Sequence, residues 1–453
     1  MKDTYLGITS FVAVLLYMVN VFVSAHFLAI LYSSLAVVLL LFAWRRMKSG
    51  NKIVVTLLLL VGSVLFLFYR PPLREILFSF GENLNLIALF VLIPLFGTFM
   101  SEAGYLQDLQ RTLLQRERGK KSHPYRLGFL LTASMGWLLN LGSMPLVYKI
   151  GAESFSSFEN KKLGMTILRG FGFCMLWSPY FVNVGLILIL YDLTWSQVGG
   201  YGIAISLIYI LVVLCFFPVT RFKEEEVITN QVAADSMSDS TSSSLHKFVL
   251  YIVLLLLFSF VFEAILPVNM LTVVSILAVV YPLVWSLCIR QFRSYIQEAS
   301  EYVRTSFPRI YNEIGIFITA GFFGEALSRS KAGDWLSHMI WTMSQGMIPL
   351  FILFLIGSVI LLALLGIHPV IIILGIGSSL TPEAFGVSSA FMGVLLLCAW
   401  TLATQVTPFS GSVLMASHLM NEKPFQVMKY NAPFILVLLI IFTGVLTVMN
   451  TFM

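Results

Sequence analysis

Two short segments of this chain place helix-breaking and polar residues in the middle of apolar sequence. The segment "GSMP" (142–145) lies within residues 127–150, and "GIHP" (366–369) lies within residues 347–380. Where a membrane helix breaks, the N–H groups of one half attract an anion, and the carbonyl groups of the other half attract Na⁺. Each interruption therefore predicts an ion-binding site.

Two more apolar segments are interrupted, by "SPY" (178–180) within residues 165–190 and by "TPF" (407–409) within residues 389–417. Irregular backbone at membrane depth is tolerated only where it is buried in protein or lines a watery cavity, so the four breaks are expected to face one another. The predicted substrate-binding residues are Asn140, Gly142, Ser143, Pro145, Ser178, Pro179, Tyr180, Asn183, Gly366, His368, Pro369, Gln405, Thr407, Pro408, Ser410 and Ser412. A coupling Na⁺ would lie near Gly142, Ser178, Gly366 and Thr407. The alternative, that these residues only cap broken helices, stays open.

Two ionisable residues are candidates for binding a proton, His368 and Glu325. Burial disfavours the imidazolium form of His368, whereas an arriving anion favours it. Its partner in the first half of the chain is predicted to be Met144. Glu325 is interpreted as the deepest membrane carboxylate, although a partner at Arg329 would make it structural. Glu313 is placed near the end of a crossing.

Arg169 is predicted to lie at the membrane interface, with its charge extended toward water. Aromatic side chains beside the breaks indicate a substrate with an apolar portion.

The composition requires a membrane protein. Of the 453 residues, 58% are hydrophobic and 11% are charged, and the mean hydropathy is +0.91. A bilayer core about 30 Å thick needs roughly 20 apolar residues per helical crossing. Uninterrupted apolar runs also exclude a β-barrel, whose strands alternate apolar and polar residues. We predict an all-α polytopic membrane protein of about eleven transmembrane helices plus two re-entrant hairpins, in two inverted-topology repeats.

The distribution of positive charge gives the predicted topology. Complete crossings are expected at 5–24, 26–44, 53–69, 86–103, 165–190, 197–218, 248–266, 268–289, 311–327, 389–417 and 431–450. With a cytoplasmic N-terminus and re-entrant hairpins at 127–150 and 347–380, all of the 28 Lys and Arg residues are cytoplasmic except Arg70, Arg74, Arg329 and Lys331. This arrangement satisfies the positive-inside rule and places the C-terminus outside. The net charge of +6 therefore reflects the loops and indicates no nucleic-acid partner.

The chain is expected to contain two related membrane units. Residues 1–80 form N-terminal scaffold helices, 81–218 the first repeat, 219–247 a cytoplasmic flexible linker, 248–310 further scaffold helices, and 311–453 the second repeat. The repeats match at three places. Gly97 corresponds to Gly324, Gly142 to Gly366, and Ser178 to Thr407, with offsets of 227, 224 and 229 residues.

These motifs resemble the ion transporter superfamily, and most nearly its divalent anion/sodium symporter (DASS) type. The segments "AGFFGEALSRSKAGDWL", "LLGIHPV" and "TLATQVTPFSGSVLMAS" occupy the family's places in order, and "GYLQDLQRTLLQRERG" matches an interfacial helix. The family's Ser-Asn-Thr hairpin tips, which bind carboxylate and flank sodium sites, are absent from both tips. The resemblance implies hairpins and broken helices that move against a scaffold, and a homodimer.

We expect a multi-pass protein of the cytoplasmic membrane that moves a small anion, by preference an organic one, by alternating access coupled to H⁺ or Na⁺. A Na⁺/H⁺ antiporter of the same superfamily is the first alternative. A lipid-handling or structural membrane protein that retains the fold is the second. No enzyme motif such as G-x-x-x-x-G-K-[ST] or H-E-x-x-H occurs, and neither an enzymatic activity nor a cofactor or structural metal is expected.

Overall fold

The structure is a computed structural model of the whole chain. It describes residues 2–106, 108, 109, 124–155, 157–220, 222, 227–229, 242–305, 307–330 and 332–452. Within these residues, ten helical segments are long and apolar enough to cross a membrane. The predicted all-α polytopic membrane fold is confirmed. Most of the predicted linker 219–247 and of the amphipathic segment 104–119 lies outside the described residues.

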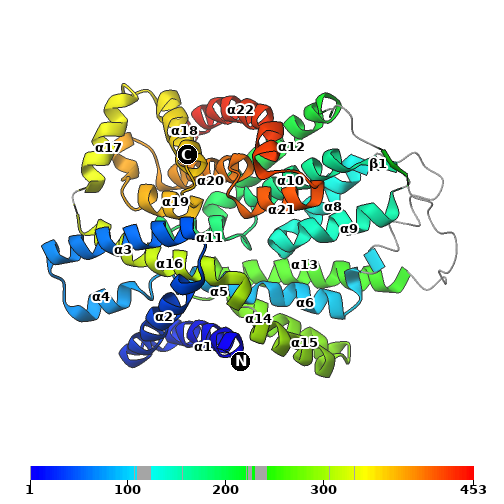
Figure 1. The fold of residues 1–453 in the computed structure, drawn as a ribbon, viewed down its shortest axis with the longest axis horizontal. Helices are drawn as coiled ribbons and strands as arrows, with labels where there is room; N and C mark the ends of the chain where they lie inside the picture. Colours follow the sequence, from blue (N-terminus) through cyan, green and yellow to red (C-terminus); the bar gives the residue numbers. More distant parts are fainter. Residues whose placement is uncertain are drawn as a thin grey trace.

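The helices form two adjoining bundles, which we call the flanking bundle and the hairpin bundle (Figure 1). The flanking bundle occupies the middle and lower part of the view. It consists of α1 (Lys2–Val23), α2 (His26–Arg46), α3 (Ser49–Tyr69), α4 (Leu73–Ser79), α5 (Leu84–Leu92), α6 (Pro94–Glu102), α13 (Ser242–Ile265), α14 (Met270–Cys288), α15 (Phe292–Thr305) and α16 (Phe307–Ser328).

The hairpin bundle occupies the upper part of the view in Figure 1. It consists of α8 (Pro124–Leu139), the 3₁₀ turn η1 (Asn140–Gly142), α9 (Ser143–Ser154), α10 (Asn160–Met175), α11 (Val182–Leu190), α12 (Trp195–Val219), α17 (Ala332–Met343), α18 (Ile348–Leu364), α19 (Pro369–Gly377), the 3₁₀ turn η2 (Pro382–Phe385), α20 (Ser389–Val406), α21 (Gly411–Met420) and α22 (Pro424–Met449). Two short strands, β1 (Ser157–Glu159) and β2 (Val227–Thr229), pair antiparallel with Phe158 opposite Ile228.

All four interruptions predicted from the sequence occur. The helices α8 and α9 contact each other on either side of η1, and α18 and α19 contact each other on either side of residues 365–368. A break at 176–181 separates α10 from α11, and a break at 407–410 separates α20 from α21. In each case a Gly or Pro makes continued α-helix costly.

Two features of the flanking bundle differ from the sequence prediction. The predicted crossing 86–103 is interrupted at Ile93, because Pro94 begins a new helix, α6. The segment predicted as a polar cytoplasmic loop after α14 contains α15, a helix of 14 residues. Its buried Tyr295 packs against Phe99, and α15 contacts α1 and α6. A single apolar stripe is enough to hold such a charged helix against the bundle.

The two broken helices lie at the centre of the hairpin bundle. Nearly every residue of α10 from Leu163 onward and of α20 from Phe391 onward is buried. A helix that is apolar all round has no solvent face, so it belongs in the interior. These two helices contact each other, and α8, α18, α21 and α22 surround them.

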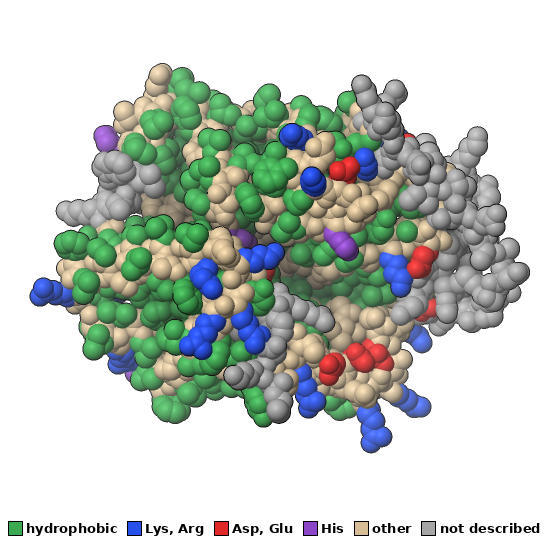
Figure 2. Space-filling model, in the orientation of Figure 1, with side chains coloured by type: hydrophobic (Ala, Val, Ile, Leu, Met, Phe, Trp, Pro, Cys, Tyr) green, Lys and Arg blue, Asp and Glu red, His purple; other side chains and the backbone are tan. Residues whose placement is uncertain are grey.

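The outer surface is apolar, as a bilayer requires. Leu67 and Phe68 on α3 and Phe27 on α2 are each more than 70% exposed. Hydrophobic side chains are spread over much of the face in Figure 2, whereas Lys and Arg side chains form one group near its centre, with others toward the upper middle, the right and the lower edge. With its ten apolar helical segments among the described residues, the protein is thus a multi-pass membrane protein.

Candidate functional site: a cleft between the bundles

Three adjoining cavities separate the flanking bundle from the tips of the hairpins. Their volumes are about 660, 260 and 150 Å³. Glu313 on α16 lines all three, and Asn140 and His368 each line two of them. We call the combined space the cleft. The largest cavity reaches the turn between α2 and α3, where it is lined by Lys48 and Asn51.

Half of the predicted binding residues line this cleft. They come from both hairpin tips and both breaks and are Asn140, Gly142, Asn183, Gly366, His368, Pro408, Ser410 and Ser412. Aromatic side chains line the smallest cavity beside them, namely Phe90, Phe171, Phe181 and Trp400. The structure therefore brings residues more than 200 positions apart into one partly polar, partly aromatic space.

The other predicted residues do not line the cleft. They are Ser143, Pro145, Ser178, Pro179, Tyr180, Pro369, Gln405 and Thr407. Tyr180 is buried and its hydroxyl lies 2.5 Å from that of Ser259 on α13. Ser143 donates to the carbonyl of Asn140 at 2.7 Å and so closes the first hairpin turn. These residues shape the breaks and face away from the cleft.

Ser178 and Thr407 make equivalent contacts in the two halves. The Ser178 hydroxyl donates to the Trp137 carbonyl at 2.8 Å, and the Thr407 hydroxyl donates to the Ala363 carbonyl at 2.7 Å. Each hydroxyl also accepts from the backbone N–H two residues later. Each hydroxyl therefore ties the break of a central helix to the end of the first arm of a hairpin.

The hairpin tips correct the predicted repeat register. Asn140 and Gly366 both have positive φ, 52° and 92°. Gly142 and His368, two residues later, are the N-caps of α9 and α19. The structural offset at the tips is thus 226 residues, and not the 224 that aligning the two Gly and Pro residues predicts. His368 corresponds to Gly142, so the predicted pairing with Met144 is wrong.

His368 holds the start of α19. Its Nδ1 accepts a hydrogen bond from the N–H of Val370 at 3.3 Å. A ring nitrogen that accepts carries no hydrogen, so in this arrangement the hydrogen of the neutral ring lies on Nε2. His368 lines two of the three cavities. One nitrogen thus caps the helix, and the other is available as a donor in the cleft.

Gln405 and Arg169 belong to a buried polar network behind the cleft. The Arg169 guanidinium donates to the Asn431 side chain at 3.2 Å and to the Thr220 hydroxyl at 3.0 Å. The Tyr209 hydroxyl contacts both the Arg169 carbonyl and the Gln405 side chain. Arg169 is only 2% exposed, so its predicted position at the membrane interface is wrong.

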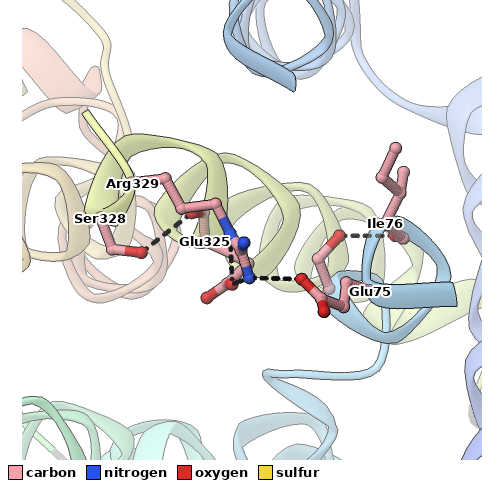
Figure 3. Close-up of polar contacts among 6 residues, drawn as sticks. Glu75, Ile76, Glu325, Ser328 and Arg329 are labelled. Atoms are coloured by element: carbon pink, nitrogen blue, oxygen red, sulfur yellow. Dashed lines mark hydrogen bonds and ion pairs between the residues drawn. The ribbon is translucent and has the colours of Figure 1, made fainter. Parts of the chain in front are cut away.

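Glu325 takes part in a partly exposed ion-pair cluster, shown in Figure 3. Arg329 lies 2.5 Å from Glu325 and 3.0 Å from Glu75, with side-chain exposures of about one third to one half. The cluster joins α4 to the C-terminal end of α16 and does not line the cleft. The structure thus shows the Arg329 partner that would give Glu325 a structural role.

Glu313 is the functional candidate that the sequence interpretation passed over. It lies in the second turn of α16, and its Oε2 atom is buried without a hydrogen-bond partner. An unpaired acidic oxygen inside a membrane protein is costly and marks a functional candidate. The sequence signal for this residue is a carboxylate at the start of an apolar run. The sequence prediction interprets that position as the end of a membrane crossing.

Thr407→Val is expected to lower the free energy of unfolding by about 1 kcal/mol, the net contribution of a typical hydrogen bond. Valine keeps the shape of threonine but removes the tie to the Ala363 carbonyl. Tryptophan fluorescence during thermal unfolding measures the effect. Thr443→Val is the control, because the Thr443 hydroxyl bonds only to Leu439 of its own helix. Equal effects of both substitutions would contradict the tie.

The fold and the cleft together define a class of protein. Apolar helices that surround a cleft with polar and aromatic lining, closed by paired hairpins and broken helices, form the architecture of a membrane transporter. Residues 174–451, more than half of the chain, match the family described as the tripartite ATP-independent periplasmic transporter, DctM component. The chain belongs to this family of secondary transporters.

One similar solved structure is that of the YdaH transporter from Alcanivorax borkumensis. It superimposes with a TM-score of 0.53 at 15% identity, over 88% of this chain and 97% of that one. At this identity the likeness concerns the fold alone. No curated protein sequence matches the chain. The predicted transporter class is thus confirmed, and the family that matches is DctM; the resemblance to the DASS type is not confirmed.

Proposed function

We propose that this protein is a secondary active transporter that moves a small organic anion across the cytoplasmic membrane by alternating access. The observation that carries the proposal is the convergence of both hairpin tips and both helix breaks on one cleft. The family supports the transporter class. The cargo, its coupling to H⁺ or Na⁺ and the mechanism are proposals.

Four helix N-termini support an anionic cargo. The first residues or caps of α9, α11, α19 and α21 all line the cleft, at Gly142, Val182, His368 and Gly411. The positive ends of helix dipoles attract negative charge, and so do N–H groups left free at a helix start. At α19 the dipole acts without them, because Pro369 has no N–H and the Val370 N–H bonds to His368 Nδ1. Lys48 adds a cation at the outer cavity. A single helix N-terminus at a cavity is common, whereas four N-termini from both halves of the chain at one cleft favour the binding of an anion.

The lining of the smallest cavity supports a cargo with an apolar portion. Phe171, Phe181 and Trp400 line it, while Asn183 and Ser412 supply hydrogen-bond partners. A monocarboxylate with an aromatic or branched body matches this lining better than a hydrophilic dicarboxylate, because its body replaces water against apolar side chains.

Movement of the hairpin bundle against the flanking bundle would expose the cleft alternately to each side. Contacts between the bundles include α16 with α19 and α5 with α11. The largest cavity opens toward the Lys48 turn. The positive-inside rule assigns that turn to the cytoplasm, together with the N-terminus. The arrangement is therefore interpreted as an inward-facing state.

Uptake into proteoliposomes tests the proposal. Succinate, 3-phenyllactate and sulfate are offered under an inward H⁺ gradient, under an inward Na⁺ gradient and in exchange with preloaded vesicles. We expect saturable uptake of 3-phenyllactate above that of succinate and sulfate. The proposal would be overturned if the protein catalysed no uptake and no exchange of any of the three anions. Na⁺/H⁺ exchange without an anion would favour the antiporter alternative.

His368→Ala is expected to weaken anion binding and to lower the unfolding temperature, because it removes both the donor in the cleft and the cap of α19. His368→Asn is the matched variant. Asparagine caps helices well, so it should recover about 1 kcal/mol of stability without restoring binding. Half-saturation for 3-phenyllactate exchange and the unfolding temperature are measured together. Full recovery of binding in His368→Asn would contradict a donor role for Nε2.

A further inference from the structure

Glu313 is the one acidic side chain among the described residues that line the cleft. It projects from α16 of the flanking bundle and faces the tips of both hairpins, because it shares one cavity with Asn140 and His368. Its Oε2 atom is buried and unpartnered. In the described part of the chain, Glu313 makes no ion pair.

The charged and titratable groups around Glu313 are few. Lys48 approaches from the turn before α3 and His368 from the start of α19. On α15, Tyr302 lines the adjoining cavity, but its hydroxyl donates to the Val91 carbonyl. From α2 and α5, no charged side chain lines the cleft. The neighbouring amides of Asn51 and Asn312 bond to each other at 3.2 Å. Among the described residues, Glu313 therefore faces two distinct basic groups and has no fixed partner.

This geometry makes an ionised Glu313 and a bound anion compete for the same surroundings. When the cleft is empty, the helix N-termini that favour an anion also favour the Glu313 carboxylate. When an anion occupies the cleft, two negative charges lie in a space of low dielectric and repel each other. A proton on Glu313 removes the repulsion and gives the unpartnered oxygen a hydrogen with which to donate.

We infer that Glu313 binds the proton that travels with the anion, so that the protein is an anion/H⁺ symporter. The inference rests on the function proposed above and extends it by naming the coupling ion and its carrier. One proton binds to the carboxylate before or with the anion, and both leave on the other side. His368 then serves as a neutral cap and donor, and Glu325 as part of a surface ion pair.

Two measurements distinguish proton coupling from anion binding. Exchange without a gradient reports binding and movement of the anion, and uptake driven by an H⁺ gradient reports the coupling. Wild-type proteoliposomes are loaded with 3-phenyllactate or succinate for exchange without a gradient, and uptake of the same probes is driven by an inward H⁺ gradient in Na⁺-free buffer. We expect Glu313→Gln to retain exchange and to lose the stimulation of uptake by the H⁺ gradient. Internal pH, read with a trapped dye, should stop responding to the anion in this variant.

Matched variants guard against general charge effects. Glu383→Gln removes an exposed carboxylate of η2 outside the cleft and should leave H⁺-driven uptake intact. Glu313→Asp keeps a titratable carboxyl and should retain coupling with a displaced pH profile. If Glu313→Gln kept H⁺-driven uptake, or lost exchange together with it, the inference would be overturned. Loss of coupling in Glu325→Gln alone, or wild-type uptake driven by Na⁺ and not by H⁺, would also overturn it.

A measurement without any anion keeps the two proposals apart. Infrared difference spectra between acidic and basic buffer should contain a protonated-carboxyl component in wild-type protein that is missing from folded Glu313→Gln, because the other carboxyl groups contribute equally to both spectra. If no probe is transported but this band is present, the proposed function fails while proton binding at Glu313 stands. If probes are transported and the band is unchanged in Glu313→Gln, the inference fails and the transporter proposal survives.

Discussion

Gly202→Ala is expected to lower the unfolding temperature markedly and to abolish transport. Gly202 lies on α12 where that helix crosses the break between α10 and α11. An added methyl group there would collide with the carbonyl oxygen of Leu176 and lie 3.4 Å from the Cα atom of Trp177. Both are backbone atoms, which cannot rotate away as a flexible side chain can. Overpacking of this kind costs about 1–3 kcal/mol.

The same helix supplies the control for this prediction. Gly200 is exposed, and a methyl group on it would meet nothing within 4 Å. Because alanine favours helix by up to about 1 kcal/mol over glycine, Gly200→Ala should leave the unfolding temperature unchanged or slightly raised. Thermal unfolding and 3-phenyllactate exchange are measured for both variants. A fully active and stable Gly202→Ala protein would contradict the close crossing.

The helix breaks could be predicted from sequence because their causes are local. Proline removes an N–H and glycine lowers helix propensity, so "GIHP", which combines the two, favours a break. Proline alone does not decide it, because α12, α14 and α22 continue through Pro218, Pro282 and Pro433. The fold class follows equally from the length of the apolar runs. The tie from Ser178 to the Trp137 carbonyl could not be predicted, because it depends on how a break meets a hairpin more than 40 positions away in the chain.

The composition of the cleft shows where sequence interpretation fails. Glu313 was placed near a membrane interface because the apolar run appears to start at residue 311, but α16 begins at Phe307 and carries Glu313 toward the hairpin tips. The position of Glu325 well inside that run predicts a greater depth, yet Glu325 is near the exposed end of α16. The depth of a side chain depends on how its helix packs in the bundle. The position of a residue within an apolar run does not reveal that packing.

Half of the predicted site residues face away from the cleft for a related reason. A break exposes backbone groups on every side, and the polar side chains beside it satisfy whichever groups are buried. Ser410 illustrates both roles, since it lines the cleft and also accepts from the N–H of Val413 at the start of α21. Residue type marks the break, whereas only the packing of neighbouring helices decides which side chains reach the cavity.

Arg169→Ala is expected to cost about 3 kcal/mol of stability, because hydrogen bonds from charged groups contribute about 1.5–3 kcal/mol each. Arg169 links α10 to Thr220 at the end of α12 and to Asn431 on α22, and its guanidinium lies 4.5 Å from the ring centre of Phe434. Arg169→Met should cost less than alanine, because methionine fills the space between the rings without burying a charge.

The substitution Arg169→Lys distinguishes two positions of Arg169, one in a buried hydrogen-bond network and one at the membrane interface. An interfacial arginine tolerates lysine, since both side chains place a cation in water. In the network, lysine would lose the two-pronged contact with Asn431 and Thr220 and leave a compact ammonium among aromatic rings. We therefore expect the unfolding temperature to fall in the order wild type, Arg169→Met, Arg169→Lys. A lysine variant as stable as wild type would contradict the buried network and favour the predicted position of Arg169 at the membrane interface. Apolar packing alone would then hold α10 against α22.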